Sequence, residues 1–383
     1  MTSKTIDNIV WFIPFKKLRD SVRDYLLFQY NIRNDIYDFL QSNNNLKDIV
    51  KEQHLSLASL KEDIKELLSL NKIRAWDSYY FGLTLFRKSI KNDSNFLLKY
   101  SNLIKDLDNE SIETINGILS KITNYNNIND PVYFSNKESE NLNRLLEEFN
   151  NKIIKVNEGL FIYDKYILPF NHFGREIFYD KYGMDYVKNL NQVKNKNIID
   201  AGGYIGDSAI LFSDYTDKNV YSFEPFLHHY NMMLKTIELN KKNNIIPVNM
   251  ALGDENKELS LYSSGNLNMG LSIEANSKQS DINQIENKVK MLTLDSYVKE
   301  NNIEVGLIKT DLEGFEQPFL KGAINTIKEQ KPVLIISIYH NYSDFFEIKP
   351  MIENLNLGYK FRIIKSEIYP SAVVSTILLA EVY

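Results

Sequence analysis

The chain has 383 residues, of which 43% are hydrophobic, so it is long and apolar enough to form two domains with sizeable cores. Its net charge of −5 argues against a protein that grips the nucleic-acid backbone, so no nucleic-acid partner is expected. Because the sequence contains no cysteine, disulfides, cysteine-ligated zinc, iron–sulfur clusters and thiol nucleophiles are excluded.

Residues 1–150 are expected to form a helical N-terminal domain. Leucine and isoleucine recur at helical spacing within 55–70 and 103–122, and glycine is nearly absent from this half. A further helix is expected to begin at Ser135, because Ser135 and Glu138 match the capping-box pattern. Since sustained heptads are absent, a helical bundle is favoured over a coiled-coil dimer, and an oligomer formed through this half remains an alternative.

The segment from Asn8 to Arg19 combines aromatic side chains with Lys16 and Lys17. Such a segment is typical of an amphipathic helix at a membrane surface, although packing of its aromatic face on the rest of the protein explains the pattern as well. The early apolar run from Ile9 to Ile13 is too short for a secretory signal, and no run approaches the length of a membrane span. We therefore expect a cytoplasmic protein, with peripheral contact at the inner face of the membrane as the open alternative.

From residue 195 onward, short β-branched runs alternate with helical patterns, which is typical of an α/β fold whose parallel sheet has helices on both faces. Seven strands are expected, at 197–201, 219–223, 245–250, 305–310, 332–338, 359–364 and 375–382. Helices are expected at 207–214, 225–242, 315–328 and 344–356. The last two strands should pair antiparallel, because the loop between them is too short for a parallel crossover. An alternating run at 258–262 predicts a hairpin within an insertion at 254–295.

The first predicted strand of this sheet ends at Asp200 and leads into a cluster of glycines. Gly202 and Gly203 would allow the backbone to turn tightly and approach a ligand. Gly206 would allow the following helix to pack close to the strand. In an open α/β sheet a ligand lies beyond the carboxyl ends of the strands, so this turn is the expected ligand site.

Glu224 ends the second predicted strand, 24 residues after Asp200, where a carboxylate accepts hydrogen bonds from the ribose hydroxyls of an adenosine. Pro225 suits the first turn of the helix that follows. Both NAD and S-adenosylmethionine (SAM) contain an adenosine. The G-x-G-x-x-G fingerprint of dinucleotide sites is broken at Ala201, and Asp200 suits the ammonium group of SAM better than a pyrophosphate. SAM is therefore favoured over NAD as the cofactor.

Five motifs follow in order: IIDAGGYIGDSA, YSFEP, NMALGDENKELSLY, LTLDSYV and IKTDLEGFEQPFLKGA. Together they resemble the successive motifs of the FkbM family of SAM-dependent methyltransferases. The resemblance implies a class I, Rossmann-like methyltransferase sheet of seven strands, here preceded by the all-α N-terminal domain. It also implies O-methylation of a sugar or polyketide hydroxyl. The cofactor-binding positions expected from these motifs are Asp200, Gly202, Gly203, Gly206, Glu224, Pro225 and Ala251. Tyr204 replaces an asparagine that is common in the family.

The catalytic residues are expected after the fourth strand, in Thr310-Asp311-Leu312-Glu313, because in class I methyltransferases this strand end lies beside the transferable methyl group. Asp311 and Glu313 are candidates for orienting the acceptor hydroxyl or for taking its proton. His340, after the fifth strand, is a further candidate for a base or a substrate contact, or else a helix cap. No metal is expected, although Asp311, Glu313 and His340 together could hold Mg²⁺.

Three further residues are expected to bind substrate. Glu316 lies on the first turn of the next helix, where its charge also suits the helix N-terminus. His172 and Arg175 belong to a lead-in segment, residues 151–194, which with Asp180 should form a lid or one wall of the acceptor pocket. The methyltransferase domain itself should span 195–383.

The main hypothesis is therefore a SAM-dependent O-methyltransferase acting on a sugar hydroxyl of a bacterial surface glycan or of its lipid- or nucleotide-linked precursor. A peptide or small-metabolite acceptor is the alternative for an enzyme. The non-enzymatic alternative is a scaffold that binds SAM without turnover and recruits partners through its helical half. Asp311 and Glu313 beside an intact cofactor turn favour the enzyme.

Overall fold

The computed structural model describes residues 6–7, 23, 26–27, 73–77, 82–263 and 285–383. The chain divides into two compact units, Met1–Asn71 and Lys72–Tyr383. The predicted membrane-surface segment at 8–19 and the predicted helix at 55–70 lie outside the described residues. The fold and the site are therefore those of the second unit.

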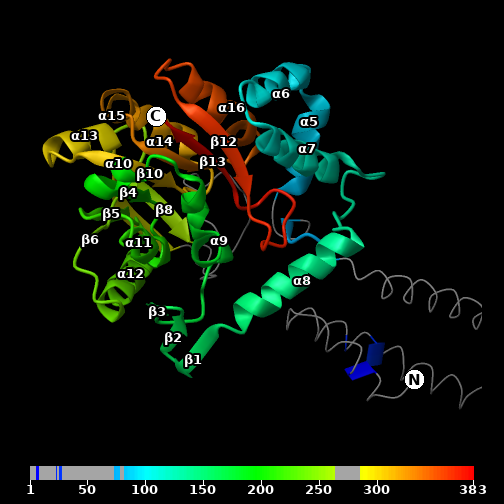
Figure 1. Ribbon diagram of the computed structural model, residues 1–383, viewed down its shortest axis with the longest axis horizontal. Helices are drawn as coiled ribbons and strands as arrows, with labels where there is room; N and C mark the ends of the chain where they lie inside the picture. The colour runs from blue at the N-terminus through cyan, green and yellow to red at the C-terminus, as the bar shows by residue number, and fades with distance from the viewer. Residues whose placement is uncertain (1–5, 8–22, 24–25, 28–72, 78–81, 264–284) are drawn as a thin grey trace, which may run out of the picture. The chain divides into compact units, whose positions relative to one another are not determined.

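A seven-stranded sheet forms the centre of this unit, in the order β12-β13-β11-β10-β4-β5-β6 (Figure 1). Its strands are β4 (Asn197–Ala201), β5 (Val220–Phe223), β6 (Ile245–Val248), β10 (Val305–Thr310), β11 (Val333–Ser337), β12 (Lys360–Lys365) and β13 (Thr376–Glu381). All seven predicted strands are present, and the predicted α/β sheet is confirmed. β13 pairs antiparallel with β12 and β11, as predicted for the last two strands, and the other pairs are parallel.

The strand order reverses between β4 and β10. From β4 the chain runs outwards through β5 to β6, and it then returns to build β10 and β11 on the other side. In open α/β sheets, ligands bind beyond the carboxyl ends of the strands at such a switch point. The two strand ends meet there, because Ala201 pairs with Thr310 and the Asp311 N–H donates to the Ala201 carbonyl at 3.0 Å. A ligand site is therefore expected beside the residues that follow Ala201 and Thr310.

Helices cover both faces of the sheet, because successive strand residues point to opposite sides. In β4, for example, the fully buried Ile198 and Ile199 belong to different core clusters. The helices of these layers are α10 (Leu190–Asn195), α11 (Asp207–Phe212), α12 (Leu227–Leu239), α13 (Leu294–Glu300), α14 (Glu316–Gly322), α15 (Ile324–Gln330) and α16 (Tyr342–Glu353). The single helix predicted at 315–328 is interrupted at Ala323, whose backbone leaves the helical conformation.

Within the described residues 82–150, the chain forms four helices before the sheet, as the sequence predicted for this part: α5 (Leu83–Asn92), α6 (Phe96–Ile104), α7 (Asn109–Thr123) and α8 (Asn136–Asn150). α8 begins after Ser135 with the predicted capping box to Glu138. α7 packs against β12, where the Ile363 N–H donates to Ser111 Oγ at 2.9 Å, and α5 to α7 share one hydrophobic core with the sheet (Figure 1). The boundary predicted at residue 150 thus falls inside the second unit.

Sequence reasoning missed a small sheet in the lead-in segment. β1 (Ile153–Asn157), β2 (Leu160–Tyr163) and β3 (Tyr166–Leu168) pair antiparallel. Two-residue turns, Glu158-Gly159 and Asp164-Lys165, join them and were the available signal for hairpins. α9 (Arg175–Phe178) and the 3-10 helix η2 (Lys181–Tyr186) follow, and α9 packs against α11.

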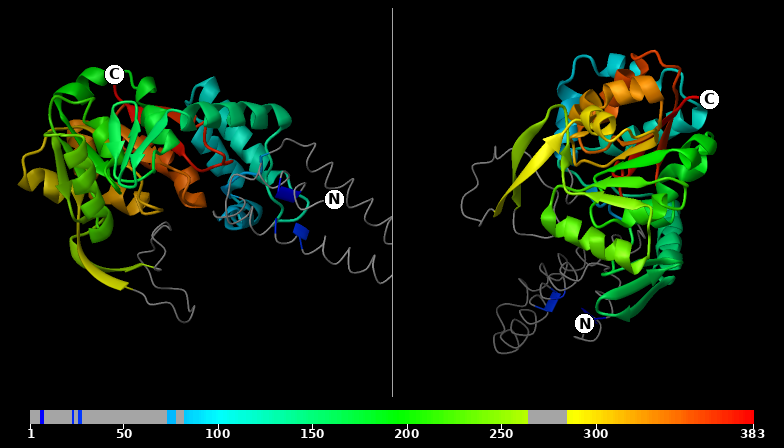
Figure 2. Two further views of the ribbon diagram at one scale, coloured as in Figure 1. Left: turned by 90° about the horizontal axis from the view of Figure 1, so that it is seen from below. Right: turned by 90° about the vertical axis from the view of Figure 1, so that its left-hand side faces the viewer.

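The insertion after β6 contains the third sheet, with β7 (Ala251–Leu252), β8 (Lys257–Ser263) and β9 (Ile285–Leu292). β8 and β9 pair antiparallel, which confirms the predicted hairpin, and they extend away from the main sheet (Figure 2). In the part of the chain that the structure describes, no helix is both long and apolar enough to cross a membrane.

Candidate active site

Glycines build the turn between β4 and α11, as predicted. Gly202 and Gly206 have φ angles of 83° and 84°, in the left-handed region that favours glycine. A β-carbon on Gly202 would collide with the backbone oxygen of Asp311, and one on Gly203 would collide with Ser222 Oγ. The backbone of the turn therefore lies directly against the ends of β10 and β5.

Asp200 supports this turn from inside the fold. Its carboxylate is fully buried, accepts hydrogen bonds from Ser222 Oγ at 2.7 Å and Ser208 Oγ at 2.9 Å, and pairs with Lys309 Nζ at 2.9 Å. Lys309 also donates to the Gly202 carbonyl at 2.7 Å. Because these partners use the acceptor positions of the carboxylate, Asp200 stabilises the turn. Its predicted contact with the ammonium group of SAM stays a prediction.

Lys309 is a functional residue that sequence reasoning missed. Its side chain is 2% exposed, and the ring of Tyr182 from η2 lies 5.3 Å from Nζ. Burial alone would lower the pKa of Lys309, but Asp200 and Asp311 raise it, so the amine stays charged. The available signal was a charged residue in the otherwise apolar strand β10, because a lysine is almost never fully buried unless it is paired.

Glu224 lies at the end of β5, next to the glycine turn, and is 5% exposed. Its Oε2 accepts a hydrogen bond from the Tyr204 N–H at 3.0 Å, and its Oε1 accepts one from the Phe226 N–H at 2.9 Å. His229 Nδ1 lies 3.6 Å from Oε1. A carboxylate has about four acceptor positions, so about two remain for ribose hydroxyls. The spare acceptors and the bare glycine backbone fit an adenosine.

The remaining residues predicted on this side lie around the same corner. The Pro225 carbonyl accepts a hydrogen bond from Asn249 Nδ2 at 3.1 Å. Ala251, in β7, is buried in a small core cluster at the start of α12. The ring of His172, predicted to bind substrate, lies 5.2 Å from the ring of Tyr204 on the glycine turn. The structure thus places His172 beside the cofactor turn.

A second group of predicted residues lies at the end of β10. Asp311 Oδ1 accepts a hydrogen bond from the Tyr339 hydroxyl at 3.1 Å and lies 3.3 Å from His340 Nε2. The other ring nitrogen, Nδ1, lies 3.0 Å from Glu316 Oε1, which also accepts the Leu312 N–H at 2.7 Å. Asp311, His340 and Glu316 are therefore in direct contact, although 29 residues separate the first two.

The charges of this group follow from its contacts. Burial alone would raise the pKa of Asp311, but His340 lowers it well below its usual range. Burial alone would lower the pKa of His340, but Glu316 and Asp311 raise it well above its usual range. At neutral pH His340 is therefore held as an imidazolium, and Asp311 is held in its ionised form.

Residues 200–361 match the family model described as the methyltransferase FkbM domain. This part of the chain is an FkbM methyltransferase domain. The match confirms the predicted family for these residues, and with it SAM as the cofactor.

Similar solved structures include an FkbM methyltransferase from Methylobacillus flagellatus KT, at 15% identity and a TM-score of 0.48, which covers 76% of this chain and 60% of that chain. A tRNA m1G37 methyltransferase from M. jannaschii has 16% identity and a TM-score of 0.32 and covers 60% and 57%. A SAM-dependent methyltransferase from Aquifex aeolicus has 11% identity and a TM-score of 0.29 and covers 51% and 87%. The chain thus spans less than two thirds of the first of these proteins. No curated protein matches the chain.

Within the FkbM domain, a metal site is a second possible use of the group at β10. Ligand atoms of Asp311, Glu316 and His340 lie within 4.8 Å of one another. However, the two nitrogens of His340 face different carboxylates, and a protonated ring cannot bind a metal. Glu313, the third ligand suggested by the sequence, has a side chain that is 59% exposed and lies 3.7 Å from His340 Nε2. The contacts favour an ion-paired histidine, and the expected absence of a metal stays a prediction.

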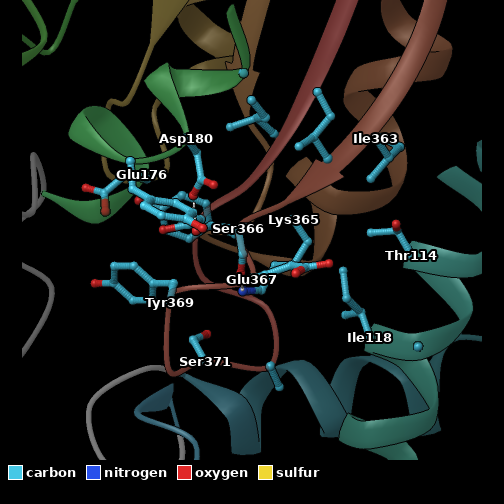
Figure 3. A pocket seen from close by; sticks show the side chains of 18 of the residues that line it. Thr114, Ile118, Glu176, Asp180, Ile363, Lys365, Ser366, Glu367, Tyr369 and Ser371 are labelled. Atoms are coloured by element: carbon cyan, nitrogen blue, oxygen red, sulfur yellow. Dashed lines mark hydrogen bonds between the residues drawn. The ribbon is translucent and has the colours of Figure 1, made fainter. Parts of the chain in front are cut away.

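Asp311 and Tyr339 are among the residues that line a cavity of about 920 Å³. Figure 3 shows this cavity from close by. One wall is formed by α7, with Thr114 and Ile118, and another by the connection between β12 and β13. Pockets for small molecules usually measure about 300–1,000 Å³. The helical half of the chain and the FkbM domain therefore line one cavity of suitable size for an acceptor.

The lead-in segment forms the third wall of this cavity through Glu176 and Asp180, in line with the wall expected there (Figure 3). Arg175, the predicted substrate contact, precedes Glu176 but is not one of the lining residues. Sequence reasoning missed Glu176, because nothing in its neighbourhood in the sequence shows that α9 folds over this space. The lead-in segment thus gives the cavity an acidic wall.

Proposed function

We propose that the FkbM domain of this chain transfers the methyl group of SAM to a sugar hydroxyl, in the biosynthesis of a bacterial surface glycan. The observation that carries this proposal is the position of Asp311 between the cofactor turn and the cavity. Its backbone lies against Gly202 of the cofactor turn, and its side chain lines the cavity. A hydroxyl bound in the cavity can therefore meet the edge of the cofactor site.

The chain offers a consistent set of groups for SAM. Glu224 would accept the ribose hydroxyls, and the backbone from Gly202 to Tyr204 would lie along the adenosine. When bound, SAM supplies a methyl group on a positively charged sulfur. The buried pair of Lys309 and Asp200 keeps the turn in shape before binding, so less ordering is needed when the cofactor arrives.

Asp311 is placed to handle the acceptor. Its ionised carboxylate can accept a hydrogen bond from the acceptor hydroxyl and so direct an oxygen lone pair towards the methyl group. With SAM supplying the methyl group, the role of Asp311 would be to hold the proton that the acceptor hydroxyl gives up. A carboxylate with a lowered pKa is a weak base, so orientation and electrostatic stabilisation are its larger contribution. His340 keeps its proton and holds Asp311 in place.

The lining of the cavity favours a polyhydroxyl acceptor over an apolar one. Hydroxyl groups both donate and accept hydrogen bonds, and tyrosine rings add flat apolar faces. A sugar presents the same combination of hydroxyls and apolar ring faces. The cavity offers this combination, because the lining residues that carry a hydroxyl group include Tyr182, Tyr186, Ser337, Tyr339, Ser366 and Tyr369.

The proposal also concerns partners and location. We infer a cytoplasmic protein whose residues 8–19 contact the inner face of the membrane and whose helical half can associate with a second copy. These points are supported by the sequence pattern alone. The net charge of −5 supports the exclusion of a nucleic-acid acceptor.

Mass spectrometry of the surface glycan tests the proposal in cells that contain the wild-type chain, the Asp311→Asn variant or neither. One O-methylated sugar should appear with the wild type alone. The variant should bind S-adenosylhomocysteine (SAH) as the wild type does, which calorimetry can verify, because the residues around Glu224 are unchanged. A glycan with identical methylation in all three cells would refute the proposed acceptor.

A further inference from the structure

The cavity beside Asp311 is strongly acidic. Among its lining residues, those with carboxyl groups outnumber lysine and arginine by eight to three. This imbalance bears on the acceptor, because a sugar linked to a nucleotide or a lipid phosphate carries negative charge, whereas a free glycan or an amino sugar does not. Which of these acceptors fits depends on which charged side chains of the cavity already have partners.

Two of the three cations are already neutralised by partners. Lys121 Nζ lies 2.8 Å from Glu138 Oε1, and Arg362 Nη2 lies 2.9 Å from Asp108 Oδ2. The third, Lys365, donates to a backbone carbonyl at 3.0 Å, and burial lowers its pKa to about 8. Recognition of a phosphate usually needs several charge-assisted hydrogen bonds. The cavity offers few of them.

Two carboxyl groups of the lead-in segment have no lysine or arginine of the described residues within ion-pair distance, although Lys365 lies near enough to interact with both. Glu176 and Asp180 line the cavity (Figure 3), and neither forms an ion pair with a described lysine or arginine. Glu176 Oε2 is buried without a hydrogen-bond partner, and Asp180 accepts a hydrogen bond from Ser366 Oγ. Burial raises the pKa of Glu176 to about 7 and that of Asp180 to about 6. A buried carboxylate is costly unless a cation accompanies it.

We propose that the acceptor is an amino sugar whose ammonium group binds at Glu176 and Asp180, next to the hydroxyl presented to Asp311. The inference rests on the proposed function, because it assigns the acceptor to the same cavity. An ammonium group supplies the charge and the donors that these two carboxyl groups lack. Tyr182 and Tyr369 also line the cavity, and aromatic side chains favour the apolar faces of a sugar ring over a peptide lysine. Phosphate-bearing sugars are disfavoured by like-charge repulsion.

Isothermal titration calorimetry on the full chain saturated with SAH tests the inference. The probes are glucosamine, N-acetylglucosamine and glucose 6-phosphate, each titrated to millimolar concentration at neutral pH. Glucosamine should bind at least about tenfold more tightly than N-acetylglucosamine, the gain expected from one charge-assisted hydrogen bond. Glucose 6-phosphate should bind most weakly. No methyl group is transferred in this experiment, so its outcome is independent of whether the chain methylates a hydroxyl.

Glu176→Gln and Asp180→Asn should each remove most of the preference for glucosamine. Glu329→Gln, on the exposed side of α15, is the matched control and should keep the preference. Thermal unfolding verifies that each variant is folded. Equal binding of glucosamine and N-acetylglucosamine by the wild type, or no binding of glucosamine, would overturn the inference. Tighter binding of glucose 6-phosphate or of a lysine-containing peptide would overturn it as well and would assign the cavity to another acceptor class.

Discussion

Replacing Lys309 with methionine should destabilise the protein, because it leaves the Asp200 carboxylate buried without its charged partner. The two side chains are 2% and 0% exposed, and Lys309 Nζ lies 2.9 Å from Asp200 Oδ1. In the Lys309→Met variant, the hydroxyls of Ser208 and Ser222 remain as donors to the carboxylate. Two neutral donors do not offset the burial of a full charge.

The expected loss follows from the two contacts that the amine makes. Removing one partner of a buried ion pair costs about 3–5 kcal/mol. The hydrogen bond to the Gly202 carbonyl adds about 1 kcal/mol. Folded domains are stable by only about 5–15 kcal/mol, so the variant loses a large part of its free energy of unfolding. The affinity for SAH should fall too, because the Gly202 carbonyl loses its hydrogen bond to Lys309 and the cofactor turn is less ordered.

Urea unfolding followed by circular dichroism measures this loss. The double variant Asp200→Asn/Lys309→Met should recover much of the stability, because a neutral amide replaces the unpaired carboxylate. Lys321→Met, at an exposed lysine of α14, is the matched control and should stay within about 0.5 kcal/mol of the wild type. If Lys309→Met itself stays within about 1 kcal/mol, the buried pair does not support the turn.

Three further predictions concern the cofactor, the domain boundary and pH. Glu224→Ala should weaken SAH binding by about 1–3 kcal/mol in calorimetry, because the ribose hydroxyls lose their acceptor. An unchanged affinity would show that Glu224 does not bind the ribose. Removal of residues 1–71 should leave SAH binding intact, whereas removal of 1–150 should abolish cooperative unfolding, because α5 to α7 share the core of the sheet; a stable, SAH-binding 151–383 would instead support the boundary predicted from the sequence. Burial raises the pKa of Asp207 from 3.8 to about 7, so the folded protein keeps a proton that the unfolded chain loses. The free energy of unfolding should therefore fall as the pH rises from about 4 to about 7, and Asp207→Asn should flatten this slope.

The architecture of the FkbM domain was predictable because its signals are local. β-branched runs of the right length predicted every strand of the main sheet, and Ser135 with Glu138 predicted the start of α8. The small sheet β1–β3 was missed, because its hairpin turns, Glu158-Gly159 and Asp164-Lys165, lack the strongest turn residues. The break at Ala323 was missed as well, although Gly322 directly before it was an available signal for a helix end.

The candidate site was predictable in part for a topological reason. The carboxyl ends of parallel strands meet at one edge, so residues that end strands, such as Glu224, Asp311 and His340, could be assigned to one site without a structure. Partners could not be assigned in the same way. The pairing of Asp200 with Lys309, and the position of Glu176 in the cavity, depend on contacts between distant segments that no local pattern encodes.

An experimental structure of the full chain with SAH bound tests the central claim most directly. The account predicts the ribose hydroxyls within hydrogen-bond distance of the Glu224 carboxylate, about 2.6–3.2 Å. It also predicts the sulfur facing Asp311 and the cavity behind it. SAH bound away from Glu224, or with its sulfur turned away from Asp311, would contradict the account.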